Sequence, residues 1–237
     1  MNLLLFEASE LEGDRLLLAP GRRLEHLLAI LKSAAGDTLR IGEINGLCGT
    51  ATVESIDTSG AVLRITALET RPPPALDLVL VLALPRPKML RRILRAVAEV
   101  GIKELHLLNT ARVEKSFWQS PLLQEARLRE YLLAGLEQTG DTHVPAVHLH
   151  QRFRPFAEDL LPALCAQRNA LLATPGADLP CPATPPTPGL LAIGPEGGFV
   201  AFEEALLEVA GCRPVSLGQR VLRVETALQA SLGRYLG

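Results

Sequence analysis

Two glycine-rich turns hold the residues best suited to chemistry. The first, Gly194-Pro195-Glu196-Gly197-Gly198, follows a short apolar run at residues 190–193. The second begins at Gly218, after residues 213–217, and leads into Arg220, Arg223, Glu225 and Thr226. Glycine allows positive φ and lets a ligand approach the backbone closely. Together, the turns would bring backbone N–H groups, guanidinium groups, carboxylates and a hydroxyl to one place.

The elements that must position these turns are two short strands and a helix. Residues 190–193 and 213–217 are too short for helices and suit buried strands. Between them, residues 201–210 have a helical pattern that ends at Gly211. Strands that alternate with helices are typical of a parallel sheet. We therefore expect the two turns at the carboxyl ends of two neighbouring parallel strands, the edge at which open α/β sheets bind ligands.

The two motifs also resemble a known family. The sequences IGPEGGF (residues 193–199) and LGQRVLRVETA (residues 217–227) are similar to the paired motif of the RsmE family. Its members are SPOUT-class methyltransferases that use S-adenosylmethionine to methylate N3 of a uridine in 16S ribosomal RNA, in the decoding region of the small subunit. The resemblance covers nearly all of residues 75–237 and, more loosely, residues 1–70.

This resemblance implies an architecture. It predicts an α/β protein in which an amino-terminal PUA-like β-barrel that binds RNA is followed by a SPOUT α/β domain with a carboxyl-terminal trefoil knot. It also implies a homodimer with the cofactor site at its interface, and small-subunit ribosomal RNA as the partner. The Arg71-Pro72-Pro73-Pro74 linker places the boundary between domains 1–71 and 72–237.

A site for S-adenosylmethionine needs an apolar slot for adenine and backbone partners for the polar edges. Apolar side chains of both motifs would line the slot, the glycines would allow close approach, and residues 174–175 would close the third side. The residues expected to bind the cofactor are Thr174, Pro175, Ile193, Gly194, Pro195, Glu196, Gly197, Gly198, Leu217, Gly218, Leu222 and Ala227. No GxGxxG turn follows an early strand, which argues against a Rossmann-type site.

The residues expected to be catalytic are Arg223, Glu225 and Thr226. Methyl transfer is an in-line displacement, so positioning supplies most of the acceleration. Uridine N3 carries a proton at neutral pH, which must be removed. Arg223 would stabilise negative charge on the uracil oxygens, and Glu225 would accept a proton or hold Arg223. The sequence does not identify the general base. Glu196 either assists the catalytic step or caps the following helix.

A basic segment at residues 86–95 is the strongest candidate for RNA contact. It has five basic residues and no acidic one, and four of them recur at i, i+3, i+4 and i+7 on one helical face. Such a face is either a phosphate-binding stripe or merely solvated. The residues expected to bind RNA are Arg22, Arg23, Lys32, Arg86, Lys88, Arg91, Arg92, Arg95, Arg112 and Arg220. Asp141 stands where the family has an arginine.

The remaining segments show different secondary-structure patterns before and after the proline linker. Residues 1–70 read as short strands around one helix at 21–33, which suggests a small barrel. Beyond the linker, strands alternate with helices, including a long helix at 117–138. Residues 174–189 are rich in proline and predict a long surface loop, mobile beyond its first two residues.

The amino-acid composition narrows the class of protein to which the chain can belong. The chain has 237 residues, of which 48% are hydrophobic and 21% charged, as in ordinary globular proteins. Its net charge of −2 argues against a general nucleic-acid binder, so any RNA-binding charge must be local. Four scattered cysteines predict no metal site and reduced, cytoplasmic thiols. No apolar run could span a bilayer, and the opening residues lack the basic lead-in of a signal peptide.

Three other interpretations remain open. The chain could be an RNA-binding assembly factor without catalysis, which predicts no cofactor binding. GPEGGF could be an anion nest for a nucleotide phosphate, although no Walker lysine follows it. The chain could also be a methyltransferase with a different RNA target, since the two motifs indicate the cofactor more than they indicate the substrate.

Overall fold

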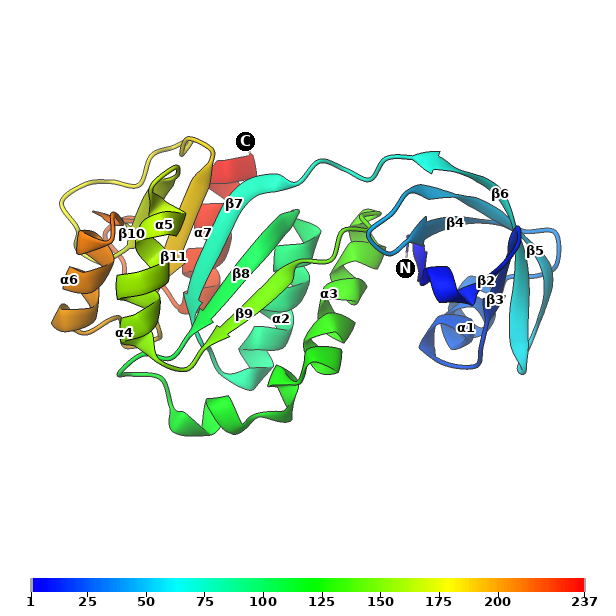
Figure 1. Ribbon diagram of the computed structural model, residues 1–237, viewed down its shortest axis with the longest axis horizontal. Helices are drawn as coiled ribbons and strands as arrows, with labels where there is room; N and C mark the ends of the chain where they lie inside the picture. The colour runs from blue at the N-terminus through cyan, green and yellow to red at the C-terminus, as the bar shows by residue number, and fades with distance from the viewer. Residues whose placement is uncertain (1, 237) are drawn as a thin grey trace. The chain divides into compact units, whose positions relative to one another are not determined.

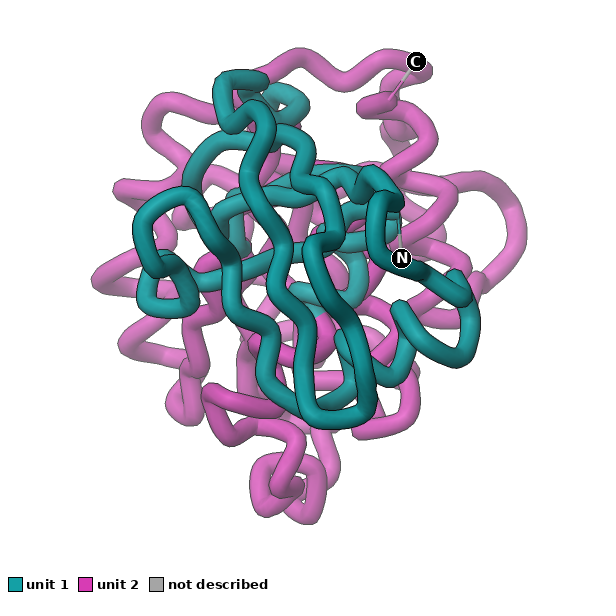
Figure 2. The backbone as a smooth tube through the Cα atoms, turned by 90° about the vertical axis from the view of Figure 1, so that its right-hand side faces the viewer, with its two compact units in different colours: residues 1–74, 132–144 teal, residues 75–131, 145–237 magenta. Residues whose placement is uncertain are grey.

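The computed structural model describes residues 2–236, which divide into two compact units. The first unit comprises residues 1–74 and 132–144, and the second comprises 75–131 and 145–237 (Figure 2). No local sequence pattern indicated that residues 132–144 accompany the amino-terminal residues. The assignment of an RNA-binding role to 1–71 and a methyltransferase role to 72–237 stays a prediction.

The first unit is built on a curled, mixed sheet of six strands in the order β1-β4-β5-β6-β3-β2. The strands are β1 (Leu4–Phe6), β2 (Leu11–Glu12), β3 (Arg15–Leu18), β4 (Thr38–Glu43), β5 (Cys48–Asp57) and β6 (Gly60–Thr70). The pair β1–β4 is parallel and the others are antiparallel. Within residues 2–236 the edge strands β1 and β2 are not paired with each other, so the expected barrel is an open half-barrel.

One helical segment packs against the inner face of the half-barrel. Helix α1 (Arg22–His26) continues into a π-helical turn, η2 (Leu27–Leu31), and these coincide with the predicted helix at 21–33. Leu24 and Leu27 are buried against Phe6 and Leu63 of the sheet. Burial of these side chains supplies the hydrophobic stabilisation of the unit.

The residues after helix α3 (Glu125–Thr139) complete the first unit. Glu137, which is buried, accepts two hydrogen bonds from the Arg22 guanidinium, at 2.6 and 2.9 Å. Asp141 is also buried, and its Oδ1 accepts from the N–H groups of Thr142 (2.7 Å) and His143 (3.0 Å). Asp141 therefore holds the backbone of this turn at the position where the family has an arginine.

The second unit is an α/β domain with a fully parallel sheet in the order β12-β10-β11-β7-β8-β9 (Figure 1). Its strands are β7 (Leu76–Ala83), β8 (Ile102–Leu108), β9 (Ala146–His150), β10 (Asn169–Ala173), β11 (Gly189–Ile193) and β12 (Arg213–Val215). Strands β7 and β11 are almost wholly buried, as expected when both faces of a sheet are covered.

Helices cover both faces of this sheet. They are α2 (Pro87–Glu99), α4 (Phe153–Pro155), the π-helical η5 (Phe156–Leu160), α5 (Leu161–Cys165), α6 (Ala201–Val209), α7 (Val224–Leu236) and the first part of α3. In Figure 1, α4 and α5 lie in front of the sheet, and α2 and α7 lie behind it. Within residues 2–236, no helix is both long and apolar enough to cross a membrane.

Two predictions about this unit were wrong. Strands β11 and β12 are not neighbours, because β10 lies between them and pairs with both. The long helix expected at 117–138 begins only at Glu125. The preceding residues form two short 3₁₀ turns, η3 (Lys115–Gln119) and η4 (Pro121–Leu123), since Pro121 interrupts the pattern and Ser120 caps the second turn.

The proline-rich loop at 174–189 is anchored at its middle. Cys181 N–H donates to the Ser216 carbonyl, and Ser216 N–H donates to the Leu179 carbonyl, each at 2.8 Å. The Arg234 guanidinium of α7 donates to the carbonyl groups of Cys181 and Pro182. These bonds extend the edge of the sheet beyond β12, which the composition of the loop did not indicate.

Candidate functional site: a glycine-loop cavity

A cavity of about 410 Å³ lies where β10, β11 and β12 end. Its size falls within the range of small-molecule sites. All twelve residues predicted to bind the cofactor line it, and so do the predicted RNA contacts Arg112 and Arg220. The remaining lining residues are Ala173, Phe199, Glu204, Val221 and Val224. The two motifs therefore meet at one site, with the end of β10 between them.

The first glycine turn needs its glycines for two different reasons. Gly198 has a φ of 72°, which side-chain-bearing residues rarely adopt. At Gly194, a Cβ would lie 3.0 Å from the Phe199 ring. The turn is thus kinked at one glycine and closely packed at another, and its backbone faces the cavity.

Arg112 holds this turn from the end of β8. Its guanidinium donates to the Gly197 carbonyl and to the Phe199 carbonyl, the latter at 3.4 Å. The Arg112 side chain also covers Gly197, where an added Cβ would lie 3.0 Å from Cδ. Arg112 therefore acts on the shape of the cavity, a role that the sequence did not suggest. Its predicted contact with RNA stays a prediction.

Glu203 forms a second link to the same region. This carboxylate is 4% exposed, and it accepts from Ala111 N–H at 2.7 Å and from Val200 N–H at 3.1 Å. Val200 immediately precedes helix α6, so Glu203 caps the helix and ties its start to the loop after β8. A negative charge in the first turn of a helix is also favoured by the helix dipole.

The three predicted catalytic residues lie at the start of helix α7. Arg223 precedes the helix, and its carbonyl accepts from Ala227 N–H at 2.8 Å. Glu225 and Thr226 belong to the first helical turn. Leu222, Val224 and Ala227 line the cavity, whereas the three predicted catalytic residues do not. Arg223 and Thr226 are exposed and Glu225 is half-buried, which leaves their polar groups open to a second, larger substrate.

The predicted RNA-binding residues of α2 form an exposed basic face, the α2 basic face, made of Lys88, Arg91, Arg92 and Arg95. The guanidinium groups of Arg91 and Arg95 lie over the ring of Tyr131, at 5.8 and 5.4 Å from its centre. Arg86, just before the helix, lies 3.6 Å from the Glu196 carboxylate of the glycine turn. Because both side chains are largely exposed, this ion pair adds little stability.

Two of the three predicted RNA-binding residues of the first unit, Arg22 and Arg23, have protein partners. Arg22 is bonded to Glu137, as described above. Arg23 donates to the Leu5 carbonyl at 2.8 Å and to both oxygens of the Glu10 carboxylate. Lys32 ends the helical segment in a left-handed conformation, with a φ of 53°, and is exposed. Contact of these three residues with RNA stays a prediction.

Sequence reasoning missed several cavity residues. Phe199 and Val221 sit inside the two motifs, so the motifs themselves could have included them. Ala173 and Glu204 come from the end of β10 and from α6, which local patterns did not connect with the cavity. Val224 also lies in the second motif, and it begins helix α7, whose first turn packs against the site.

This fold and this site define an α/β protein with a glycine-loop cavity for a small ligand at the carboxyl edge of a parallel sheet. Residues 72–235 match the family model of an RNA methyltransferase domain. The chain is 34% identical over 236 residues to ribosomal RNA small subunit methyltransferase E of Treponema pallidum, covering 98% of this chain and 89% of the relative. The enzyme of the same name from Synechocystis is 30% identical, covering 90% of this chain and 70% of the relative. The chain belongs to the ribosomal RNA small subunit methyltransferase E family.

Solved structures show the same fold. The enzyme from Neisseria gonorrhoeae, solved with S-adenosylmethionine bound, has a TM-score of 0.76 at 21% identity, covering 97% of this chain and 95% of that one. A putative methyltransferase from Legionella pneumophila, also solved with this cofactor, has a TM-score of 0.76 at 23% identity, covering 98% and 95%. These likenesses support the half-barrel and the parallel sheet described above.

Proposed function

We propose that the chain is an S-adenosylmethionine-dependent methyltransferase that acts on N3 of a uridine in 16S ribosomal RNA, in the decoding region of the small subunit. The observation that carries the proposal is the convergence of all twelve predicted cofactor residues on one cavity. Family membership and the cofactor in the related solved structures support the same ligand.

The chemistry follows from what the cavity offers. The apolar side chains of Ile193, Leu217 and Leu222 receive the adenine, and the glycine turns present backbone groups to the polar edges of the cofactor. In the reaction the methyl carbon leaves the sulfonium sulfur, which takes the bonding electron pair, and bonds to uridine N3. The N3 proton must leave, and Glu225 accepts it or holds Arg223 while the guanidinium stabilises charge on the uracil oxygens. Thr226 adds a hydroxyl beside them.

The cofactor part of the proposal is tested by calorimetry with the purified chain. We expect saturable S-adenosylmethionine binding, and we expect Leu222→Trp to abolish it by filling the cavity. The control Leu236→Trp changes an exposed leucine at the end of α7, 59% exposed, and should bind normally. Binding that survives in Leu222→Trp would refute this cavity as the cofactor site. If ATP binds and S-adenosylmethionine does not, the anion-nest interpretation takes its place.

The substrate part is tested on ribosomal RNA. We expect 16S ribosomal RNA from cells lacking the protein to lose one N3-methyluridine, read by mass spectrometry, and to regain it on complementation. Complementation with Arg223→Ala should fail. If the modification persists without the protein, the substrate assignment is wrong. Cofactor binding combined with methylation of another RNA would identify a different target.

Three further elements of the proposal rest on the family resemblance: a PUA-like role for the half-barrel, a trefoil knot and a homodimer with the cavity at its interface. Val221 supports the dimer, since this apolar residue is 78% exposed at the cavity. Light scattering should give twice the mass of the chain. In single-molecule force extension, the fully stretched chain should be shorter than an unknotted chain of 237 residues, because residues held in the tightened knot do not add to its length. Cell fractionation should find the protein in the cytoplasm with ribosomal subunits.

A further inference from the structure

We propose that Glu104, His106 and His148 form a binding site for a divalent transition-metal ion of the zinc type. The site lies on the face of the parallel sheet against which η5 packs, and shares no residue with the glycine-loop cavity. Neither the scattered cysteines nor the family resemblance pointed to it. The sequence led us to expect no metal at all.

The strand geometry brings the three side chains together. Glu104 and His106 are two residues apart on β8, so they point to the same face of the sheet. His148 of β9 is the direct partner of His106 in the parallel pairing, and their rings stack with centres 4.8 Å apart. One ligand atom from each of the three residues lies within 4.8 Å of the others. Two imidazoles and a carboxylate are a recurrent protein ligand set for zinc.

A fourth residue orients the central ligand. His106 Nδ1 lies 2.9 Å from His150 Nε2, and His106 Nε2 lies 2.9 Å from Glu104 Oε1. When Nδ1 donates its proton to His150, Nε2 has its lone pair available on the side of Glu104. A metal ion would enter between these two atoms, in place of a shared proton. A hydrogen bond from the second nitrogen of a ligating histidine is typical of metal sites.

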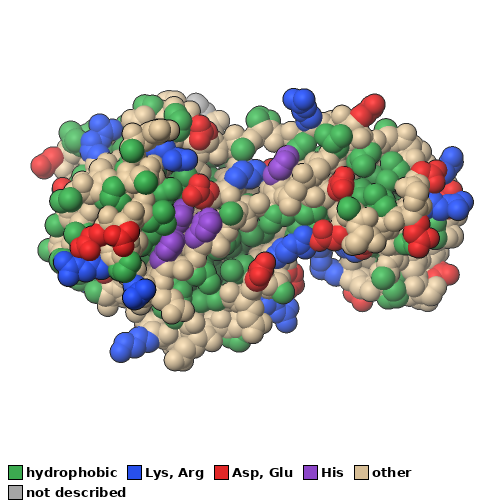
Figure 3. Space-filling view, in the orientation of Figure 1, with side chains coloured by type: hydrophobic (Ala, Val, Ile, Leu, Met, Phe, Trp, Pro, Cys, Tyr) green, Lys and Arg blue, Asp and Glu red, His purple; other side chains and the backbone are tan. Residues whose placement is uncertain are grey.

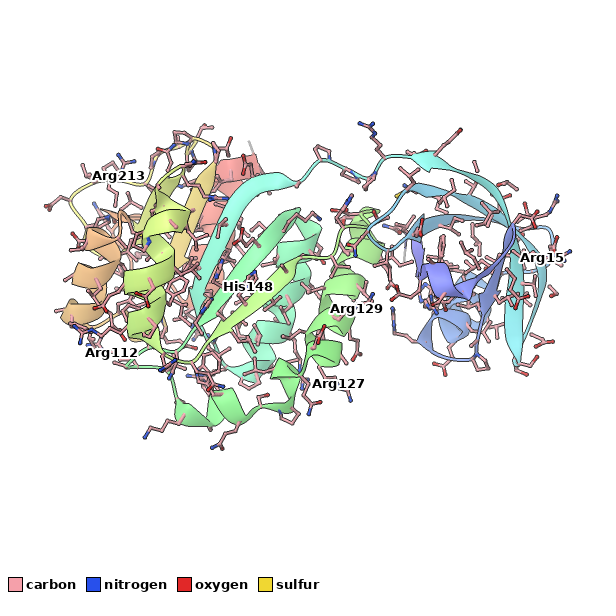
Figure 4. The ribbon with its side chains drawn as sticks, in the orientation of Figure 1. Arg15, Arg112, Arg127, Arg129, His148 and Arg213 are labelled. Atoms are coloured by element: carbon pink, nitrogen blue, oxygen red, sulfur yellow. The ribbon has the colours of Figure 1, made fainter. Side chains whose placement is uncertain are left out.

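The surroundings suit an ion with one open side. The His106 side chain is only 3% exposed, whereas that of Glu104 is 34% exposed and His148 is exposed. Phe156 of η5 covers the inner side, with its ring centre 5.7 Å from that of His106 and 4.6 Å from that of His150. Histidine side chains gather on this surface in Figure 3, and Figure 4 labels His148 among them. Solvent can supply the remaining ligand.

The separation of the ligand atoms is close to what zinc needs. Metal–ligand distances of about 2.1 Å in a tetrahedron place ligand atoms roughly 3.4 Å apart. Glu104 Oε1 is already 2.9 Å from His106 Nε2, and the three ligand atoms all lie within 4.8 Å of one another. A shift of the exposed His148 side chain toward this pair would complete the set. Imidazole nitrogen favours zinc, nickel or copper over magnesium or calcium.

The proposal is tested with the full chain, purified without a histidine tag and stripped with a chelator. Zn²⁺ is titrated by calorimetry, with Mg²⁺ and Ca²⁺ in parallel runs. We expect one Zn²⁺ ion to bind per chain, a higher melting temperature with Zn²⁺, and neither effect with Mg²⁺ or Ca²⁺. His148→Ala and Glu104→Gln should lose saturable binding. His150→Ala, which removes the orienting contact but none of the three proposed ligands, should weaken affinity by about 10- to 100-fold.

The matched control is His143→Ala, a histidine outside the cluster with a side chain 51% exposed. It should bind Zn²⁺ as the unchanged chain does, and circular dichroism should show that all variants are folded. Lack of saturable Zn²⁺ binding to the unchanged chain would overturn the proposal and leave a hydrogen-bonded histidine cluster. Undiminished binding in His148→Ala would overturn it as well, because the ion would then bind without one of the three proposed ligands.

Discussion

Arg112 and Gly197 are joined across 85 residues of sequence by a hydrogen bond from the guanidinium to the glycine carbonyl. Arg112 follows β8, whereas Gly197 lies in the turn after β11, and β7 separates these strands in the sheet. The bond therefore fixes the first glycine turn relative to the middle of the sheet. Cofactor affinity and stability should both depend on hydrogen bonds of this kind, which join loops at the ends of different strands.

Arg112→Lys should weaken S-adenosylmethionine binding about tenfold, since lysine cannot donate to both the Gly197 and Phe199 carbonyls, and a lost charge-assisted bond costs about 1.5 kcal/mol. Calorimetry without RNA measures this directly. The control Arg152→Lys changes an exposed arginine outside the cavity and should bind the cofactor normally. If Arg112→Lys leaves cofactor binding intact but weakens RNA binding, Arg112 is an RNA contact instead.

Glu203→Gln should destabilise the chain by about 1–3 kcal/mol and lower cofactor affinity. The carboxylate accepts from two backbone N–H groups, and an amide offers one oxygen while burying an NH₂ group without an acceptor. Urea denaturation measures the stability. Glu208→Gln changes an exposed residue of the same helix and should stay within about 0.5 kcal/mol of the unchanged chain. Equal stability of both variants would show that the Glu203 contacts contribute nothing net.

Lys88→Ala combined with Arg92→Ala should weaken binding to small ribosomal subunits. If both side chains of the α2 basic face neutralise phosphates, the slope of log affinity against log salt should fall by about 1 per contact. Filter binding at several salt concentrations measures this slope. Arg127→Ala is the control: Arg127 (labelled in Figure 4) lies on helix α3 and is paired with Glu130. An unchanged slope in the double variant would mean that this face is merely solvated.

The stability of the first unit should depend on the charge of Glu10. Burial acts to raise the pKa of this carboxyl, but hydrogen bonds from Arg23 and the Glu7 N–H, with the Arg23 charge, outweigh it and hold the pKa below its usual 4.5. Because the folded pKa is the lower one, the stabilisation is fully present above pH 4.5 and is lost as pH falls through the folded pKa.

Glu10→Gln isolates this contribution. Denaturation at neutral pH should show a loss of about 1–2 kcal/mol relative to the unchanged chain. The difference should shrink in acid, where both chains carry a neutral side chain at this position. A difference that stays constant from neutral to acidic pH would show that the Glu10 charge does not stabilise the fold.

The sequence alone determined the local elements and the motifs. Strand β11 (Gly189–Ile193) contains the predicted strand at residues 190–193, because an apolar run that ends in a glycine turn is a local property of the sequence. The two glycine turns were predicted for the same reason, since a position such as Gly198 demands a conformation that few other residues adopt.

Only the tertiary structure decided which strands are neighbours and which side chains meet. The order of strands in a parallel sheet depends on crossover connections, so no local pattern shows that β10 separates β11 from β12. The same holds for Arg112, whose partner lies 85 residues away. His106 and His148 look unrelated in sequence until pairing of β8 with β9 sets them side by side. Contacts between residues that are distant in sequence depend on how the whole chain packs, and no short segment of sequence determines that packing.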